Sequence, residues 1–519
     1  MSTPAVPKQL SPAQIWFVVA GLMVGGFLST LDVLVVITAL PTIVGDLGGR
    51  AELSWVLTAY LLASTVAGPL FGRLSDLIGR RRLYELSILI FVFGSVLGGI
   101  SQNIDELIVA RAIQGIGAGG LMTLPFAIVA DITTPRERAR YTSIMVMNFT
   151  VASVLGPLIG GLFVDHLSWR WIFFINIPLG ALALLASLRT RLPVQRAQKV
   201  VIDYLGTLLM VGATSALLLA FTWGGSEHAW DSSTILGLFG GAAVLVTALI
   251  FWERHTDEPL LPPRLFGNAR FNLLVGSTLL AAIAMYSGWA LMPIFLQVVT
   301  GASATNSGVL VLPFVAGNTI ASLVTGRIVA RTGRAKWAPV VGQLIAAGGF
   351  FLYTTMDAET TRFTASLFMA IAGFGLGMAL QIVMVIGQSI VDPGDLGAGT
   401  AMIAFFRNLG SSFGAAIGLG TLNSQLSHNL DQRLAPAQLA RLPAEALQGS
   451  PAAIRELAPG VRHAVVAAFA DALHSAFLVT FPTALAGLAL FLFVRHVRLG
   501  DRLVIEDPEV IAESHASGL

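Results

Sequence analysis

The chain has 519 residues, of which 55% are hydrophobic and 12% are charged, and its mean hydropathy is +0.78. A water-soluble protein of this length needs more charge to cover its surface, so the composition indicates a protein whose solvent is a lipid bilayer. The absence of cysteine excludes disulfides and thiol chemistry. The net charge of +2, without a long basic run, gives no sign of a nucleic-acid partner.

Apolar runs of about 20 residues recur along the chain and predict an all-α membrane protein with about fourteen transmembrane helices. The first run follows a short N-terminal segment without a signal-peptide cleavage pattern, so we expect that run to be retained in the protein. The predicted spans are 14–40, 52–72, 83–101, 104–130, 139–163, 171–188, 203–223, 233–252, 271–299, 306–330, 337–355, 362–388, 396–422 and 471–495.

The loops between these spans alternate in their content of Lys and Arg. One alternate set, which includes both terminal segments, carries 22 of these residues and the other carries 7. Basic residues favour the cytoplasmic side of a membrane, so both termini are predicted to be cytoplasmic, in agreement with an even number of spans. The Ala-, Gly- and Arg-rich composition with few Lys points to a bacterial source, and thus to a multi-pass protein of the bacterial inner membrane.

Two sequence patterns recur at similar offsets. GRLSDLIGRRR at 72–82 and GRIVARTGRAK at 326–336 lie 254 residues apart, and GIGAG at 115–119 and GFGLG at 373–377 lie 258 apart. The repetition predicts a duplicated six-helix unit with two extra helices between the copies. The expected domains are an N-terminal six-helix bundle at 1–190, two inserted helices at 191–270, and a C-terminal six-helix bundle at 271–519.

The C-terminal part contains the one long extracytoplasmic loop that the sequence predicts, at 424–468. Its Leu/Ala periodicity with scattered Arg and Glu suggests short amphipathic helices at the outer membrane surface. Such helices could gate an opening, contact lipid or dock a partner. The alternative is a tolerated surface insertion.

Asp32 and Arg111 are charged residues inside predicted spans. An ionised carboxylate in hydrocarbon is costly, so Asp32 is expected to face a cavity or a partner. Burial favours the protonated carboxyl and a nearby cation favours the ionised form, so a site that alternates between these environments can carry a proton. Alternatively, Asp32 caps a break in its span or bonds a neighbouring helix. Arg111 needs an acceptor, for which Asp32 or a carbonyl of the first span is the candidate, and Gln114 is expected on the same face.

Several motifs resemble those of a known family. RAIQGIGAG at 111–119, ASVLGPLIGG at 152–161 and the loop at 72–83 resemble signatures of the major facilitator superfamily, as does Leu31-Asp32 followed by Ala39-Leu40-Pro41. WRWIFFINIPLG at 169–180, TWGG with the following Trp230, and FFRNLGSSFG at 405–414 are typical of its fourteen-span drug:proton antiporters, the QacA- and EmrB-like family. The resemblance covers nearly the whole chain. The sequence departs from the signatures at Leu34, Ile37, Ala152 and Ala330, and the first two departures remove polar groups beside Asp32.

The resemblance implies the major facilitator fold, with two six-helix bundles plus two extra helices, and it assigns roles by position. The implied roles are proton coupling for Asp32 and Arg111; a gating loop for Gly72, Asp76, Gly79 and Arg80; and an antiporter helix for Gly156, Pro157, Gly160 and Gly161. Separately, the polar and aromatic residues inside the predicted spans could line a substrate cavity: Gln114, Asn148, Trp289, Gln297, Asn318, Gln381 and Arg407. Each of these could instead be a helix–helix contact, and Arg407 could lie near the cytoplasmic interface.

The sequence thus predicts a proton-coupled multidrug efflux antiporter that exports amphipathic cationic or neutral compounds by alternating access and confers antibiotic resistance. The proton gradient would be its energy source, without a cofactor, because the chain has no G-x-x-x-x-G-K-[ST] loop. No nucleophile constellation or metal spacing suggests an enzyme. The alternatives are an exporter of lipids or lipid conjugates and a membrane scaffold without transport. The expected partners are substrates, protons and membrane lipids; a monomer is expected, and a periplasmic adaptor protein stays open.

Overall fold

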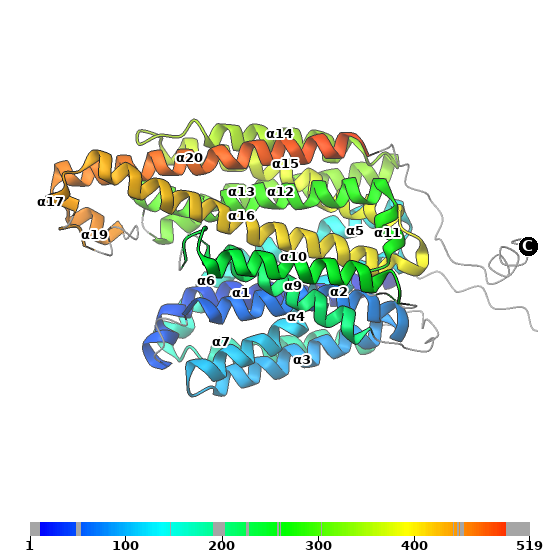
Figure 1. Cartoon of the computed structure of the whole chain (residues 1–519). Coiled ribbons are helices and arrows are strands. Elements are labelled where there is room, and N and C mark those ends of the chain that lie inside the picture. Colours follow the sequence, from blue (N-terminus) through cyan, green and yellow to red (C-terminus); the bar gives the residue numbers. More distant parts are fainter. Residues whose placement is uncertain are drawn as a thin grey trace, which may run out of the picture.

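The computed structural model describes residues 11–47, 53–145, 147–189, 203–224, 228–256, 259, 261–302, 304–439, 441–443, 446 and 451–494. These ranges are mostly helical, and the long helices run along one common direction (Figure 1). The helices are α1 (Pro12–Leu47), α2 (Leu53–Ile78), α3 (Arg80–Ile100), α4 (Ile104–Ile132), α5 (Pro135–Met145), α6 (Met147–His166), α7 (Trp171–Phe174), α8 (Asn176–Arg189), α9 (Tyr204–Trp223), α10 (Ser233–Glu253), α11 (Pro263–Gly267), α12 (Ala269–Ile294), the π-helical η1 (Phe295–Val299), α13 (Ala304–Thr332), α14 (Trp337–Tyr353), α15 (Arg362–Ser389), the 3-10 turn η2 (Pro393–Asp395), α16 (Leu396–Arg433), α17 (Pro436–Leu439), α19 (Pro451–Glu456) and α20 (Pro459–Leu492).

Each predicted span contains helix, as a lipid environment requires, because a helix satisfies its own backbone hydrogen bonds. In the part of the chain that the structure describes, ten helices are long and apolar enough to cross a membrane, and 205–221 and 337–353 are shorter apolar helices. The predicted span at 139–163 is divided between α5 and α6, and the span at 396–422 is part of the longer and more polar α16. The number of fourteen crossings therefore stays a prediction.

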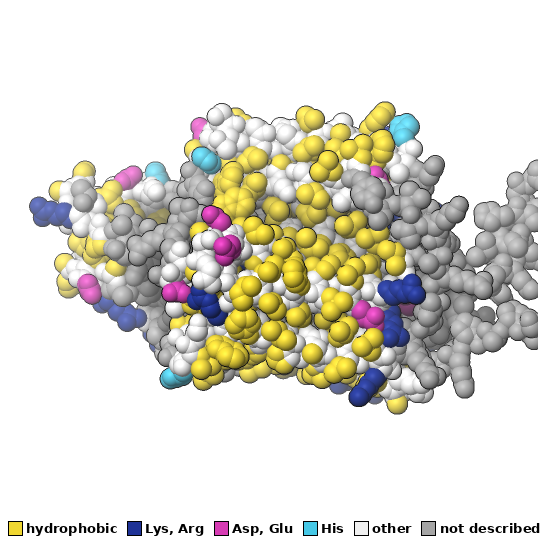
Figure 2. Space-filling view, turned by 90° about the horizontal axis from the view of Figure 1, so that it is seen from below, with side chains coloured by type: hydrophobic (Ala, Val, Ile, Leu, Met, Phe, Trp, Pro, Cys, Tyr) yellow, Lys and Arg dark blue, Asp and Glu magenta, His cyan; other side chains and the backbone are white. Residues whose placement is uncertain are grey.

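The face of the molecule seen in Figure 2 carries a wide hydrophobic band, with charged side chains gathered toward its two edges. Large apolar side chains such as Leu208, Val244, Phe251 and Phe363 are exposed, as expected where lipid replaces water. The start of α1 and the end of α20 lie at one edge, which we call the terminal end. There Trp16 packs against Tyr141, and Lys336 donates to the carbonyl of Leu492. We call the opposite edge the distal end.

The helices pack as two bundles with matching arrangements. In the N-terminal bundle α4 packs against α1, α2 and α3, while α1 also contacts α6 and α8. In the C-terminal bundle α15 packs against α12, α13 and α14, while α12 also contacts α16 and α20. The two bundles meet where α2 contacts α16 and where α5 contacts α13. These two contacts are equivalent, because exchanging the two bundles converts one into the other. An internal duplication produces this arrangement.

The glycine ladders make the same close approaches in both bundles. A Cβ atom at Gly117 would lie 2.7 Å from the carbonyl oxygen of Ser87 in α3, and one at Gly375 would lie 2.5 Å from that of Gly342 in α14. Gly115 likewise faces the backbone of Tyr60 in α2, and Gly373 faces that of Phe314 in α13. Small residues allow such close backbone contact between membrane helices, so α4 and α15 are equivalent central helices.

The pair α9 and α10 lies over the boundary between the two bundles (Figure 1). α9 packs against α10 and contacts both α2 and α16. Phe221 of α9 packs on Phe413 of α16, with ring centroids 3.9 Å apart, and Trp223 contacts Trp55 of α2 edge to face at 5.9 Å. The pair therefore covers the line along which α2 and α16 meet.

A helical projection extends from the distal end (Figure 1). α16 continues to Arg433 and α20 begins at Pro459, so the connection predicted at 424–468 is largely helical, with α17 and α19 between the two long helices. Arg433 forms an ion pair with Asp471 across the base of the projection. α16 and α20 thus continue beyond their apolar segments along their own axes, and short helices occur between them as expected, while a position of these short helices on the membrane surface stays a prediction.

Candidate functional site

Asp32 lies in the distal part of α1 and is buried, with 1% of its surface exposed. Its Oδ2 atom accepts a hydrogen bond from Nη1 of Arg111 in α4 at 2.5 Å. Its Oδ1 atom accepts from Nε2 of Gln114 and from Nδ2 of Asn176, both at 2.8 Å. α1 is continuous through Asp32, so the carboxylate ties α1 to α4 and α8 and caps no break in its own helix.

Arg111 is fully buried and faces three kinds of partner. Besides Asp32, Nη1 donates to Oε1 of Gln114 at 2.8 Å, and Nε donates to the carbonyl of Val56 in α2 at 3.3 Å. The guanidinium also lies 4.1 Å from the ring centroid of Tyr60, whose face attracts a cation. Nη2 has no hydrogen-bond partner. A buried ion pair is stable only when further hydrogen bonds satisfy both groups, and here Gln114 supplies bonds to both.

Sequence analysis missed Asn176 and Ser95. Asn176 is fully buried and donates to Asp32 and to Oγ of Ser95 at 2.9 Å, and Ser95 donates to the carbonyl of Phe173 at 2.8 Å. Asn176 stands within the quoted motif WRWIFFINIPLG, where it is the one amide in an apolar run, so that contrast could have identified it. We call Asp32, Ser95, Arg111, Gln114 and Asn176 the Asp32 cluster.

The Asp32 cluster lies inside the N-terminal bundle, nearer the distal end. Arg111 is seven residues after the start of α4, about 10 Å along the helix. The charges of Asp32 and Arg111 cancel, so the cluster is neutral while Asp32 is ionised. Protonation of Asp32 would leave the positive charge of Arg111 uncompensated in the bundle. Such a charge costs free energy in a buried site, so the protonated cluster would favour a rearrangement of the helices around it.

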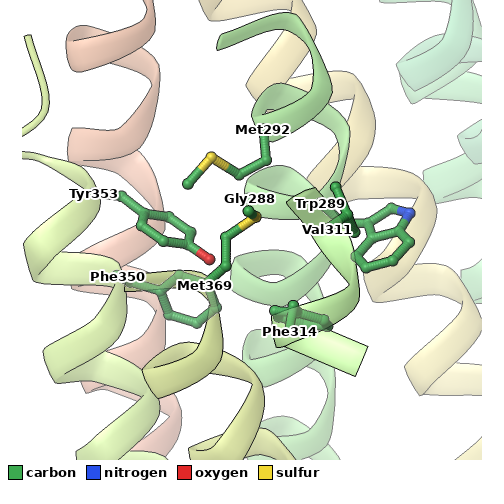
Figure 3. A pocket seen from close by; sticks show the side chains of 8 residues that line it. All are labelled: Gly288, Trp289, Met292, Val311, Phe314, Phe350, Tyr353 and Met369. Carbon is green, nitrogen blue, oxygen red and sulfur yellow. The ribbon is translucent and has the colours of Figure 1, made fainter. Parts of the chain in front are cut away.

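The corresponding region of the C-terminal bundle is apolar. A small pocket there is lined by Gly288, Trp289, Met292, Val311, Phe314, Phe350, Tyr353 and Met369 (Figure 3). Tyr353 and Phe350 lie on one side of the pocket, and the indole of Trp289 extends away from them on the other side (Figure 3). The hydroxyl group of Tyr353 is the one polar side-chain group among these residues apart from the indole nitrogen. We call this set the aromatic pocket.

The other residues predicted for a substrate cavity are dispersed. Gln114 belongs to the Asp32 cluster, and Trp289 lines the aromatic pocket, 5.2 Å from the ring of Phe314. Asn148, Gln297, Asn318 and Gln381 are half-buried on four helical segments, and Oε1 of Gln381 is buried without a partner. Arg407 is half-buried in α16.

Arg407 lies deeper than an interfacial position. It is eleven residues from the start of α16, about 16 Å from the terminal end, which is about half the thickness of a bilayer core. Of the two alternatives for Arg407, this depth favours an interior position over one near the cytoplasmic interface.

The predicted gating loop lies at the terminal end. Gly79 has a φ of 103°, a conformation that glycine adopts without strain, and it joins α2 to α3. Gly72 packs against the backbone of Gly397 in α16. Arg80 forms an ion pair with Asp131 and donates to Oγ of Ser75 at 3.0 Å. The side chain of Asp76 lies outside the described set, so its pairing with an arginine stays a prediction.

Asp395, which the sequence did not single out, connects this region to the C-terminal bundle. Its Oδ1 atom accepts from Nη2 of Arg264 in α11 at 2.6 Å, and Arg73 of α2 lies 3.9 Å from the same oxygen. Asp395 is buried and stands at the start of α16. It therefore ties α2 and the segment after α10 to the same end of α16.

Arg138 lies at the terminal end near this network. Burial lowers its pKa to about 10, and Asp131 acts in the opposite direction. Its Nη2 atom donates to the carbonyl of Ala130 at 2.6 Å. At neutral pH the side chain stays charged.

The predicted antiporter helix is α6. A Cβ atom at Gly156 would lie 2.7 Å from Cβ of Leu34 in α1, so this glycine permits close packing of α6 on α1. Gly160 is buried, whereas Gly161 has no atom within 4 Å of the place where a Cβ would stand. The side chain of Pro157 is outside the described set. Across the described ranges, no three His, Asp or Glu side chains gather in a way that could hold a metal ion.

Two helical bundles related by duplication, one of them with a buried ion pair, are the architecture of many secondary transporters. The family model described as Major Facilitator Superfamily matches residues 22–415. The chain belongs to this superfamily, as the motif resemblance predicted, and is therefore a multi-pass membrane transporter and not an enzyme.

Relatives and solved structures agree with this assignment. The chain is 39% identical over 494 residues to the uncharacterized MFS-type transporter Rv1877 of Mycobacterium tuberculosis strain H37Rv, covering 95% of this chain and 71% of that protein. It is 34% identical over 515 residues to the multidrug transporter protein MdtP of Bacillus subtilis, covering 95% of each. The crystal structure of the human organic anion transporter MFSD10 has the same fold, with a TM-score of 0.63 at 16% identity over 93% of this chain and 100% of that one.

Proposed function

We propose that this protein is a proton-coupled antiporter of the bacterial inner membrane that exports amphipathic, drug-like compounds by alternating access, with both termini in the cytoplasm. The drug part of the proposal is supported by MdtP, whose name describes a multidrug transporter and which matches along 95% of its length. The proton part is supported by the ion pair of Asp32 and Arg111, which is fully enclosed by protein. The proton gradient supplies the energy, and no cofactor is required.

The observation that carries the proton-coupling proposal is that one carboxylate holds α1, α4 and α8 together. Asp32 accepts from Arg111, Gln114 and Asn176, so its protonation weakens the bond to Arg111 and reduces the acceptor capacity that the carboxyl offers to the two amide donors. The helices then pack differently in the protonated and ionised states. A proton that binds from one side and leaves to the other would in this way bias the two states of the transporter.

The direction of the cycle is supported by contacts between the bundles at the terminal end. There Nε of Arg136 in α5 donates to the carbonyl of Ala330 in α13 at 2.5 Å, and Nε2 of Gln388 donates to the carbonyl of Phe126 at 3.2 Å. These contacts hold the terminal end closed in this conformation. With the termini in the cytoplasm, it is the conformation in which an exporter releases its substrate outward.

The test is proton movement in proteoliposomes with an imposed pH gradient. Addition of a substrate, taken from a panel of ethidium, pyrenebutyrate and a neutral amphiphile, should dissipate the gradient with the wild-type protein and fail to do so with Asp32→Asn. Asp46→Asn, which removes an exposed acid of the same helix, is the matched control and should behave as the wild type. Persistent coupling in Asp32→Asn would exclude Asp32 as the proton carrier.

The aromatic pocket favours one alternative substrate class. Its walls are nearly all apolar, and its volume in this conformation is about 10 Å³, so an acyl chain or a drug ring would enter only after the surrounding helices move apart. An exporter of lipids or lipid conjugates would therefore show bound lipid after purification and would respond to lipids instead of dyes in the same proton assay. Dye-driven proton movement without such lipid would favour the drug exporter.

A further inference from the structure

We infer that Arg407 binds an anionic group of the transported compound, so that the preferred substrates are amphipathic acids. This inference rests on the proposed transport function and names its substrate class. Arg407 lies about 16 Å inside the protein along α16, at a depth where a cation needs a partner. Among the residues that the structure describes, it has neither a hydrogen bond nor an ion pair.

The position of Arg407 on α16 directs it to the space between the bundles. On one face of α16, Gly397 and Ala401 approach Gly72 of α2, and on another face Gly410 packs on the carbonyl of Leu279 in α12. With 3.6 residues per turn, Arg407 lies between these faces, about 60° from Gly410 and about 120° from Ala401.

The other side of α16 is covered by α9. Phe413, which packs on Phe221, lies between Gly410 and Ala401 on the side of the helix that does not contain Arg407. α2 belongs to the N-terminal bundle and α12 to the C-terminal bundle, so the strip of α16 that carries Arg407 faces inward, away from α9 and the lipid. Arg407 is also incompletely buried, so open space adjoins it.

Among the side chains that the structure describes, none near Arg407 offers it a negative charge. Tyr286 of α12 is the ionisable neighbour close enough to act on it electrostatically, and a phenol is neutral at physiological pH. Arg111, which also lies deep within a span, is already paired with Asp32. Arg407 therefore contributes an uncompensated positive charge at its own depth, which attracts an anion and disfavours a cation.

An apolar surface for the rest of such a substrate lies along α12 toward the distal end, because Trp289 is ten residues, about 15 Å, beyond Leu279, the residue that Gly410 contacts. Trp289 follows Tyr286 by three residues on α12, so the two side chains share a face of that helix. Trp289 is half-buried and lines the aromatic pocket on the side away from Tyr353 (Figure 3). A guanidinium forms two parallel hydrogen bonds with a carboxylate, and an indole further along the same space can pack on an aromatic ring. The combination fits an aromatic or apolar carboxylic acid.

The test uses pyrenebutyrate and its methyl ester, which share the apolar part and differ in charge. Binding to the purified full-length protein in nanodiscs is measured at pH 7 by pyrene fluorescence. The wild type should bind the acid at least about tenfold more tightly than the ester, as expected for a charge-assisted hydrogen-bonded pair. Arg407→Gln should reduce this ratio to about one, Arg407→Lys should retain part of it, and the matched control Arg433→Gln, on the projection of the same helix, should leave it unchanged.

A charge reversal provides a second readout. Arg407→Glu should bind a pyrenyl trimethylammonium compound more tightly than pyrenebutyrate, which a purely structural role for Arg407 would not produce. The inference is wrong if the wild type fails to prefer the acid, or if the preference persists in Arg407→Gln. Because binding requires no proton gradient, this result is independent of the Asp32→Asn experiment. A protein that couples dye export to protons without preferring acids would retain the proposed function and lose this inference.

Discussion

The two bundles have the same helix packing and opposite interiors at equivalent places. Arg111 and Met369 each stand four residues before the glycines, Gly115 and Gly373, that contact α2 and α13. Those glycines face the backbones of Tyr60 and Phe314, which makes this second pair equivalent as well.

A third pair extends the correspondence. Ser95 and Phe350 each follow a glycine, Gly94 or Gly349, that packs against the central helix of its own bundle. Of the three pairs, the N-terminal members contact or belong to the Asp32 cluster, and the C-terminal members line the aromatic pocket.

This difference teaches that the scaffold and its chemistry are separable. Close backbone contacts at the glycines are retained in both bundles, whereas the side chains one turn away are ionic in one bundle and apolar in the other. An ionic cluster can respond to a proton and an apolar pocket can accept the hydrophobic part of a substrate. The simplest division of labour assigns the proton to the N-terminal bundle and most of the substrate contact to the C-terminal bundle.

The largest expected effect comes from exchanging the two interiors at Arg111. Arg111→Met introduces the residue found at position 369 and leaves Asp32 buried without its cation, which should lower the free energy of unfolding by about 3–5 kcal/mol. Thermal unfolding in detergent would measure the loss. Adding Asp32→Asn to Arg111→Met should recover much of the stability, since no buried charge then remains. If Arg111→Met alone were as stable as the wild type, the ion pair would not hold this bundle together.

A smaller effect tests the shared scaffold. Gly117→Ala and Gly375→Ala should each destabilise the protein by about 1–3 kcal/mol, because the new Cβ would lie within 2.7 Å of a backbone oxygen of the adjacent helix. Gly161→Ala is the control, since no atom lies within 4 Å there, and alanine should stabilise the helix by up to about 1 kcal/mol. Unequal losses at positions 117 and 375 would contradict the equivalence of α4 and α15.

The smallest effect distinguishes the exposed acid of α1 from the buried one. Hydrogen bonds from Trp169 and Arg170 lower the pKa of Asp46 below its ordinary value of 3.8. The stabilisation is therefore fully present above pH 3.8 and is lost as the pH falls through the lower, folded-state pKa. An NMR titration of the Asp46 carboxyl should give a midpoint below 3.8 that rises in Trp169→Phe and less in Arg170→Gln. A midpoint of 3.8 or above in the wild type would contradict the assignment.

Much of the fold was predictable because its signals are local. Apolar runs, glycine ladders and the loop pattern at 72–82 and 326–336 each express a requirement of one helix or one turn. The membrane class and the family assignment followed from these and are confirmed. The projection was not predictable in this way, since α16 and α20 continue as helices through polar sequence where the hydropathy signal ends.

The partners in the candidate site were harder to predict for a physical reason. Asp32 and Arg111 are conspicuous because an isolated charge in an apolar span is costly. Asn176, Asp131 and Asp395 acquire their importance from helices distant in sequence, as in the bond from Asn176 to Asp32 and the bond from Arg264 to Asp395. The aromatic pocket has no sequence signal of its own, since its residues are ordinary for a membrane helix.

The continuity of α16 has a mechanical consequence. The helix has 38 residues, so it is about 57 Å long, and it carries the contact with Gly72 near one end and Arg433 near the other. A long helix that pivots where it touches the opposite bundle acts as a lever arm, so a small tilt at that contact becomes a much larger sweep at the projection. Spectroscopic labels on the outermost turns of α16 would then report the rocking of the whole molecule.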